Sequence, residues 1–193
     1  GIIHAAGIGP VTPLLASQSV QTLAACFAAK VLGTWVLHTV SQDLQLDFFV
    51  MFSSAAATWG GKGQGHYAAA NHFLDALAHA RRAQQQPALS LALGPVAGGG
   101  MTAAAPLQFS DLGLQTLPTT GLGEALALAL GAGGGQFTVA AVDWARFKPL
   151  YEFHRRMPLF ESLAAESSAH SFSASPPTDL RAALLMCAGV DPF

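Results

Sequence analysis

Four polar side chains stand out in this apolar chain because together they can act on a carbonyl group: Lys30, Ser54, Tyr67 and Asn71. A serine hydroxyl can hydrogen-bond a ketone oxygen, and a tyrosine hydroxyl can give a proton to the alkoxide that forms there. Free tyrosine has a pKa of about 10, so proton transfer near neutral pH benefits from a nearby cation. Lys30 is the candidate cation, since it lies in an otherwise apolar helical segment.

The elements that position these residues follow from the pattern around them. Residues 48–52 form a short apolar run that ends in two serines, which is typical of a buried parallel strand. A glycine-rich turn follows at 59–65, and the alanine-rich segment 66–82 has high helix propensity. Because ligands bind beyond the carboxyl ends of strands in open α/β sheets, Ser54 is expected at such an end. Tyr67 begins the next helix, and the asparagine one turn later shares its face.

Each of the four residues also has an ordinary structural interpretation. Lys30 can be a surface lysine whose stem lies along an amphipathic helix. Ser54 can be a strand-end hydroxyl, Tyr67 a half-buried aromatic and Asn71 a helix-surface amide. Their combination and order along the chain favour a site.

That combination resembles the ketoreductase domain of modular type I polyketide synthases, a branch of the short-chain dehydrogenase/reductase family. The strings FSSAA, GQGHYAAANHFLDALA and IIHAAG are similar to that family, over about residues 1–160. Most of the wider family has lysine four residues after the tyrosine and asparagine on the earlier helix. The polyketide ketoreductases have these two exchanged, as this chain does. The resemblance implies an α/β fold, a Rossmann-like doubly wound parallel sheet.

The composition fits one domain of that class. The chain has 193 residues, of which 51% are hydrophobic and only 10% charged, with a formal net charge of −2. With no basic patch, nucleic acid is not an expected partner. We expect no signal peptide and no apolar run long enough to span a membrane. Cys26 and Cys187 form no metal-binding spacing and are expected as free thiols in the cytoplasm. The seven histidines are scattered, so no metal site is expected.

The beginning of the chain reads like the middle of a Rossmann-type fold. No GxGxxG loop stands between a strand and a helix, so the phosphate-binding turn is expected to be missing. By resemblance, the chain is the carboxyl-terminal half of a ketoreductase domain that lacks its amino-terminal, nucleotide-loop half. Residues 1–165 would form the catalytic subdomain. Residues 166–193, which begin with a stretch rich in Ser, Ala and Pro, would form a linker and the start of a following segment.

The resemblance also assigns residues to the cofactor and to the substrate. It places a nicotinamide cofactor beside Lys30 and Tyr67 and beside two short segments, namely His4, Ala5, Ala6 and Gly7 after the first strand, and Gly94, Pro95 and Val96 after a strand at 88–93. Met101 would begin a lid over the substrate that extends to about Leu117. A plain strand with a glycine turn would explain the first segment equally well.

Two positions bear on stereochemistry. In the family, tryptophan at the position of Trp59 accompanies the A-type outcome, an L-configured hydroxyl. The Leu-Asp-Asp motif of the opposite type is replaced by Gly-Pro-Val at 9–11. Gln64 lies where a subset of A-type members carry histidine, which implies a substrate without an epimerised α-substituent. Alternatively, Trp59 packs under the glycine loop.

The function implied by the resemblance is NADPH-dependent reduction of a 3-ketoacyl thioester on an acyl carrier protein. Activity is expected to need the upstream half of the domain, and neighbouring synthase domains are expected partners. Two alternatives stay open. One is a catalytically silent reductase-fold domain, and the other is a stand-alone short-chain dehydrogenase that acts on a small carbonyl compound.

Overall fold

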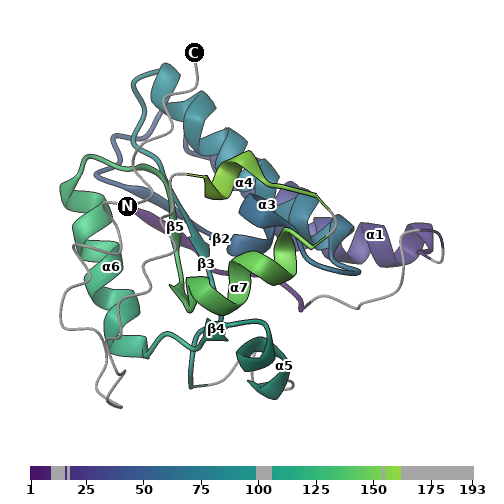
Figure 1. Cartoon of the computed structure of the whole chain (residues 1–193). Coiled ribbons are helices and arrows are strands. Elements are labelled where there is room, and N and C mark those ends of the chain that lie inside the picture. The colour runs from purple at the N-terminus through teal and green to yellow at the C-terminus, as the bar shows by residue number, and fades with distance from the viewer. Residues whose placement is uncertain (10–15, 17, 99–105, 154, 162–193) are drawn as a thin grey trace. The chain divides into compact units, whose positions relative to one another are not determined.

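The computed structural model describes residues 1–9, 16, 18–98, 106–153 and 155–161 (Figure 1). The chain forms two compact units. The first unit consists of Gly1–Leu93 and Leu126–Thr138, and the second consists of Gly94–Ala125 and the described residues from Val139 onward. The expected lid residue Met101 and the expected linker at 166–193 lie outside the described residues.

A four-stranded sheet forms the centre of the first unit, in the order β1-β2-β3-β5. Its strands are β1 (Ile2–His4), β2 (Phe49–Ser54), β3 (Leu89–Leu93) and β5 (Gly135–Val139). β2 is parallel to both β1 and β3, and Ser54 is aligned with Leu93. β2 and β3 are almost continuously buried, as expected of parallel strands covered on both faces. The predicted strands at 48–52 and 88–93 are thereby confirmed.

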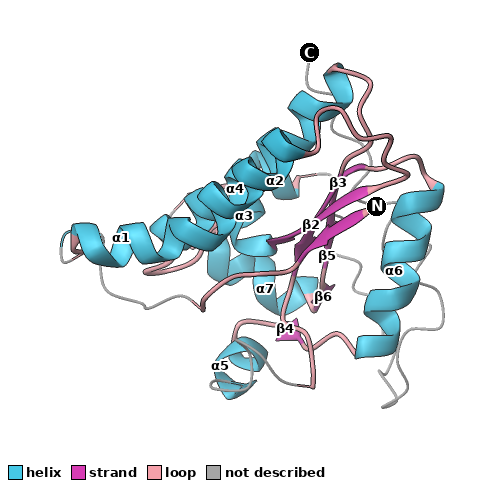
Figure 2. Cartoon of the chain, turned by 180° about the vertical axis from the view of Figure 1, so that it is seen from behind, coloured by secondary structure: helices cyan, strands magenta, loops and turns pink. Residues whose placement is uncertain are grey.

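Helices cover this sheet. α1 (Val20–Phe27), η2 (Ala28–Gly33), α2 (Thr34–Val40), α3 (Ala55–Trp59) and α4 (Gly65–Ala83) belong to the first unit. Figure 2 shows them on one side of the strands, and the end of α6 (Thr119–Gly131) on the other. Ser19 caps α1 by accepting a hydrogen bond from the backbone N–H of Thr22. α3 was not predicted, because its sequence leads directly into the glycine-rich turn.

The core between α4 and the strands is apolar. Its buried members are Phe49, Met51, Leu74, Leu77, Ala78 and Ala88. A buried arginine on α4, Arg81, closes one end of this cluster, with its guanidinium 4.1 Å from the centre of the Phe49 ring. Arg81 Nη1 also lies 2.9 Å from His38 Nδ1, which ties α4 to α2. These contacts fix the helix that carries Tyr67.

The helix that carries Lys30 contains a wider turn. Residues Ala28–Gly33 form a π-helix between α1 and α2. Such turns are rare in proteins, and those that occur are often at functional sites. His4, at the end of β1, is buried and its Nε2 lies 3.1 Å from the carbonyl oxygen of Ala29. The wide turn therefore has a partner on the sheet one residue before Lys30.

The same helical stretch corrects one expectation. The 21 residues Val20–Val40 are long and apolar enough to cross a membrane by length and composition, although no such run was expected. The core helix of a soluble protein passes the same test. Lys30 lies in the middle of this stretch and hydrogen-bonds to β2, so the stretch packs against the sheet in the first unit.

The second unit is built around α7. It contains α5 (Pro106–Asp111), β4 (Leu114–Gln115), β6 (Ala141–Val142), α7 (Trp144–Tyr151) and η4 (Pro158–Phe160). β4 and β6 are antiparallel. The apolar run at 136–143 is therefore not one strand, because β5 ends at Val139 and β6 pairs with β4. At Gly113 the backbone φ is 78°, and a Cβ there would lie 2.9 Å from the Asp143 carbonyl oxygen.

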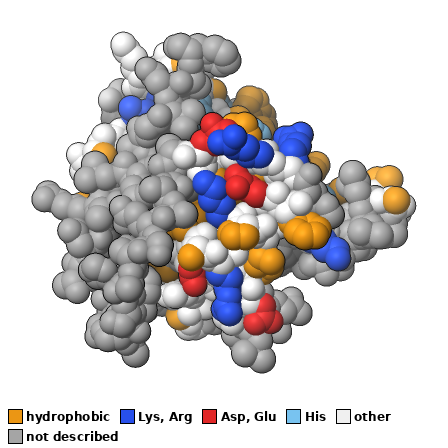
Figure 3. Space-filling view, in the orientation of Figure 1, with side chains coloured by type: hydrophobic (Ala, Val, Ile, Leu, Met, Phe, Trp, Pro, Cys, Tyr) orange, Lys and Arg blue, Asp and Glu red, His pale blue; other side chains and the backbone are white. Residues whose placement is uncertain are grey.

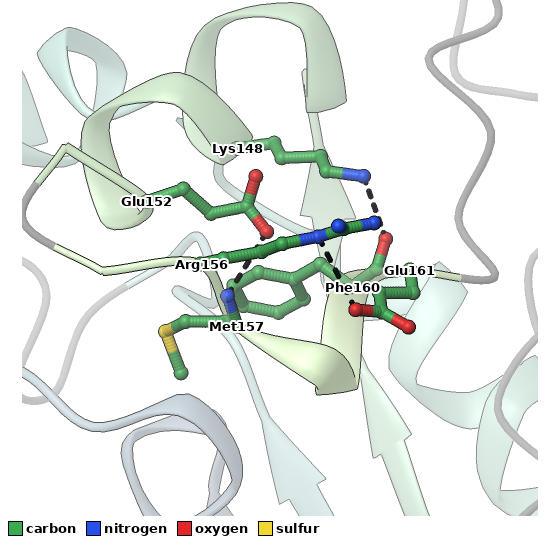
Figure 4. A network of polar contacts seen from close by, with 6 residues as sticks. All are labelled: Lys148, Glu152, Arg156, Met157, Phe160 and Glu161. Atoms are coloured by element: carbon green, nitrogen blue, oxygen red, sulfur yellow. Dashed lines mark hydrogen bonds and ion pairs between the residues drawn. The ribbon is translucent and has the colours of Figure 1, made fainter.

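An aromatic cluster and a few polar contacts hold the end of this unit. The rings of Phe147 and Tyr151 stack at 4.1 Å, and Phe160 meets Phe147 edge-on. Figure 4 shows the polar contacts around Phe160, where Lys148 Nζ donates to its carbonyl oxygen at 2.8 Å. Arg156 and Glu161 form an ion pair of 3.2 Å beside it. On the face seen in Figure 3, basic and acidic side chains are mixed instead of separated by sign.

Candidate active site

Ser54 is the last residue of β2 and also the N-cap of α3. Its backbone is extended, and its Oγ accepts a hydrogen bond of 3.2 Å from the N–H of Ala56. Serine suits this position because its short hydroxyl satisfies a free N–H at a helix start. The hydroxyl therefore lies at the carboxyl end of the parallel strands, where ligands bind in this class of fold.

Tyr67 lies in the first turn of α4 and is 9% exposed. Burial raises the pKa of its hydroxyl, while hydrogen bonds with the side chains of Ser54 and Asn71 lower it. Ser54 comes from the end of β2, and Asn71 lies one turn after Tyr67 on α4. The structure thus brings three of the four predicted residues together around one phenolic oxygen.

Lys30 comes from the π-helical turn and is only 3% exposed. Its ammonium donates a hydrogen bond of 2.6 Å to the carbonyl oxygen of Phe52, two residues before Ser54. Burial lowers the pKa of Lys30 to about 8, against the opposing influence of Cys26 and Asp75. The lysine is therefore charged at neutral pH, and a modest rise in pH neutralises it.

Asn71 is fully buried. Its Nδ2 donates a hydrogen bond of 2.8 Å to the backbone carbonyl of Tyr67, which holds the side chain along the helix. Within the described residues its Oδ1 has no hydrogen-bond partner. A buried acceptor without a partner is uncommon and is typical of a place where water or a ligand completes a network.

The segment after β1 fits a planar cofactor group. The small residues Ala5 and Ala6 directly follow β1 and are exposed. Their short side chains leave room for a ring beyond the carboxyl end of this strand. The side chain of His4 is directed at Ala29 instead, so any contact from His4 would come from its backbone.

A cavity of about 320 Å³ adjoins this segment within the first unit. It is lined by Ile8, Gly9, Gln21, Thr22, Ala25, Cys26 and His66. His66 directly precedes Tyr67, and Cys26 contacts Tyr67 in a small apolar cluster. The cavity therefore lies at the amino-terminal turn of α4, beside the tyrosine.

The remaining predicted residues are divided between the units. Trp59, at the end of α3, and Gln64, just before α4, are half-buried in the first unit. Gly94, Pro95 and Val96 lie in the second unit. There the carbonyl of Pro95 accepts a hydrogen bond of 2.7 Å from the N–H of Leu117.

Three further polar residues behind the site were not predicted. Asp75 follows Asn71 by one helical turn, and the hydroxyls of Ser53 and Ser90 face it from β2 and β3. Two signals were available in the sequence: a carboxylate on the same helical face as Tyr67 and Asn71, and serines inside otherwise apolar strands.

Comparisons with known proteins identify the family of the chain. A family model described as the KR domain matches residues 1–98. The chain is 43% identical over 167 residues to polyketide synthase GfsA of Streptomyces halstedii, covering 84% of this chain and 2% of that synthase. It is 36% identical over 162 residues to erythronolide synthase EryA3 of Saccharopolyspora erythraea, covering 84% of this chain and 5% of that synthase.

Solved structures give the same result. An A-type ketoreductase structure from a modular polyketide synthase matches with a TM-score of 0.82 at 32% identity, covering 84% of this chain and 35% of that chain. The first ketoreductase of the tylosin synthase matches with a TM-score of 0.79 at 41% identity, covering 84% of this chain and 36% of that chain. The fold is therefore the Rossmann-like fold of the short-chain dehydrogenase/reductase type.

Within that class, the chain belongs to the KR domain family, the ketoreductase domains found in modular polyketide synthases. It spans about a third of the length of the ketoreductase structures it matches and a few per cent of the synthases.

Proposed function

We propose that this chain supplies the proton-donating part of a ketoreductase that reduces a 3-ketoacyl thioester, carried by an acyl carrier protein, to a 3-hydroxyacyl thioester. The observation that carries this proposal is the convergence of Ser54 and Asn71 on the Tyr67 hydroxyl. The buried, charged Lys30 is bound to β2, the strand that ends in Ser54. The ketoreductases among its relatives and structural neighbours support the same reaction class.

The residues have separate tasks. Ser54 donates a hydrogen bond to the substrate carbonyl oxygen and orients it, while Tyr67 gives its hydroxyl proton to the same oxygen as negative charge develops there. Lys30 stabilises the tyrosinate that remains, and Asn71 holds a water through its free Oδ1 for return of the proton. A reduced nicotinamide, when bound, supplies the hydride that the β-carbon receives.

The cofactor in this proposal is NADPH. The exposed Ala5 and Ala6 and the half-buried Gly7 would lie against it, and Lys30 and Tyr67 would contact its ribose. The family resemblance also assigns Gly94, Pro95 and Val96 to the cofactor. The choice of NADPH over NADH comes from the family resemblance.

The proposed product is the A-type, L-configured alcohol. Trp59 and Gln64 carry this part of the proposal, because both are half-buried on the chain between Ser54 and Tyr67. A large indole there would restrict the side from which the ketone enters. Solved structures described as A-type and A1-type ketoreductases are among those that the chain resembles.

The proposed partners are the acyl carrier protein, the rest of the ketoreductase domain and neighbouring synthase domains, in the cytoplasm. Relatives that are multidomain synthases support this arrangement. Residues 1–165 would be catalytic, and 166–193 would lead to a following segment. Because the chain spans about a third of the matched ketoreductases, turnover is expected only with the remainder of the domain.

The test is an assay of the complete ketoreductase domain that contains this chain. A 3-ketoacyl thioester on its carrier protein should be reduced with NADPH faster than with NADH, and faster than a panel of small ketones and aldehydes. Chiral analysis of the product should give the L-alcohol. Preferred turnover of a small carbonyl compound would instead support a stand-alone dehydrogenase, and cofactor binding without turnover would support a silent domain.

A further inference from the structure

Asp75 continues a row of buried polar residues on α4, in which Tyr67, Asn71 and Asp75 follow one another at intervals of four residues. It is 5% exposed, so its carboxylate is almost fully removed from water. Burying a carboxylate is costly unless it is hydrogen-bonded and compensated by a positive charge. An apolar residue would fill the same position without that cost, so the polar side chain requires an explanation.

Two serine hydroxyls satisfy the carboxylate from the sheet. Ser90 Oγ on β3 donates to Asp75 Oδ1 at 2.6 Å, and the Ser53 hydroxyl on β2 also hydrogen-bonds this carboxylate. In the sheet register Ser90 is aligned with Met51, so Ser53, two residues further, faces the same side. Burial raises the pKa of the Asp75 carboxyl, and the hydrogen bonds with Ser90 and Ser53 oppose that rise and favour the ionised form.

The cation that can compensate the buried Asp75 carboxylate is the Lys30 ammonium. Among the described residues, Asp75 is the one buried acid, and no carboxylate is at ion-pair distance from the Lys30 ammonium. The ammonium bonds to the Phe52 carbonyl, and the next residue on the strand is Ser53. One peptide unit of β2 therefore links the group that holds Lys30 to the group that holds Asp75. Between buried charges, water screens such an interaction little.

We propose that Asp75 is a positioning residue of the site: its carboxylate, held by Ser90 and Ser53, is the buried counter-charge that keeps the Lys30 ammonium protonated at the carboxyl end of β2. Its role in the reaction rests on the proposed reductase function, whereas its effect on Lys30 does not. The single hydroxyl proton of Ser53 is shared between the Asp75 carboxylate and the backbone carbonyl oxygen of Asn71, which lies 3.2 Å from Ser53 Oγ. The same cluster thus ties the turn that carries Asn71 to the strand that carries Ser54.

The other titratable groups nearby do not replace Asp75. Cys26 and His4 face Lys30 from α1 and β1, but burial raises the pKa of the thiol and lowers the pKa of the imidazole, so both are neutral near pH 7. On α4 itself, His72 and His79 lie one turn either side of Asp75 and favour its ionised form. β2 and β3 contribute no charged side chain. In agreement with the geometry, Asp75 raises the pKa of Lys30 against the effect of burial.

The test compares Asp75→Asn with Asp43→Asn in the complete ketoreductase domain. Asparagine keeps the shape and the acceptor oxygen for Ser90 but removes the charge, and Asp43 is an exposed acid of the same unit. The titration of Lys30 is followed by NMR of ¹³C-labelled lysine, with its signal assigned by its loss in Lys30→Met. We expect Asp75→Asn to lower the pKa of Lys30 by about one unit and to move the alkaline limb of kcat/KM equally. Asp43→Asn should change neither.

An unchanged Lys30 titration in folded Asp75→Asn overturns the proposal, even if the rate falls, since a merely structural role lowers the rate at all pH values. If the variant does not fold, the wild-type protein decides. Its Lys30 signal should then show a second, smaller step at the pH where the Asp75 carboxyl carbon titrates, and the absence of that step overturns the proposal. If no ketone is reduced but the Lys30 titration shifts, only the reductase function fails.

Discussion

The Lys30 ammonium donates a 2.6 Å hydrogen bond to the carbonyl oxygen of Phe52, so the cation of the site is held by the backbone of the strand that ends in Ser54. This contact makes the position of Lys30 depend on two elements, the π-helical turn and β2. The lysine is buried and still charged at neutral pH. Its charge state and its cost to stability are both measurable.

The first prediction concerns the pH dependence of reduction. Because the pKa of Lys30 is about 8, kcat/KM should fall as the pH rises through about 8, where the ammonium loses its proton. Tyr67 does not set this limb, since burial raises the pKa of its hydroxyl. A pH profile of kcat/KM with saturating cofactor checks this. A rate that stays level up to pH 10 would contradict the role of Lys30.

The second prediction concerns stability. The folded-state pKa of Lys30 is below that of the unfolded chain, so between about pH 8 and 10.5 the unfolded state binds the extra proton and stability rises with pH. Below pH 8 the buried ammonium costs its full penalty. Lys30→Met should therefore raise the free energy of unfolding at pH 7 by about 1–3 kcal/mol, and the gain should shrink above pH 8.

Urea unfolding at pH 7 and pH 10 measures this difference. Lys62→Met is the matched control, because Lys62 is exposed and its loss should leave stability nearly unchanged at both pH values. Equal behaviour of the two variants would show that Lys30 is not desolvated in the folded protein.

The third prediction separates capping from catalysis. Ser54 and Ser19 are both N-cap residues whose hydroxyls accept a backbone hydrogen bond. Replacement of either by alanine should cost about 1 kcal/mol of stability. Only Ser54→Ala should also lower kcat, by about 100-fold, because only Ser54 lies beside Tyr67. Similar kcat values for the two variants would reduce Ser54 to a cap.

The fourth prediction concerns the π-helical turn. His4→Leu removes the hydrogen bond to the Ala29 carbonyl and should cost about 1 kcal/mol. Because the π-helical turn also positions the Lys30 side chain, kcat of His4→Leu should fall together with its stability. His4→Gln, which keeps a donor, should recover part of both losses. Urea unfolding and steady-state kinetics of the two variants check this, and a full rate with leucine would show that Lys30 is aimed without His4.

Much of the first unit followed from the sequence. The apolar run before Ser54 forms β2, and the alanine-rich segment forms α4. These elements were predictable because the apolar period, glycine positions and caps are local signals. Placing Ser54 and Tyr67 together needed the additional rule that ligands bind at strand carboxyl ends.

Other features depend on contacts that the sequence does not display. The π-turn at Ala28–Gly33 leaves no local signal, since its partner, His4, lies on a distant strand. The sequence does show Asp75 on the same helical face as Tyr67 and Asn71, but its pairing with Ser90 and Ser53 becomes visible only when the sheet forms. Proximity to lysine was expected to lower the pKa of the tyrosine. In the structure, hydrogen bonds with Ser54 and Asn71 lower it, and burial raises it.

The most direct test is the rate of ketone reduction by Tyr67→Phe in the complete domain, compared with Tyr151→Phe. The chain has two tyrosines, and Tyr151 belongs to the aromatic cluster of the second unit. Loss of the proton donor should lower kcat by a factor of about 100 to 10,000 in Tyr67→Phe, with cofactor binding and folding retained. Tyr151→Phe should keep nearly the full rate. A Tyr67→Phe variant that reduces the 3-ketoacyl thioester as fast as the wild type would contradict the proposed site.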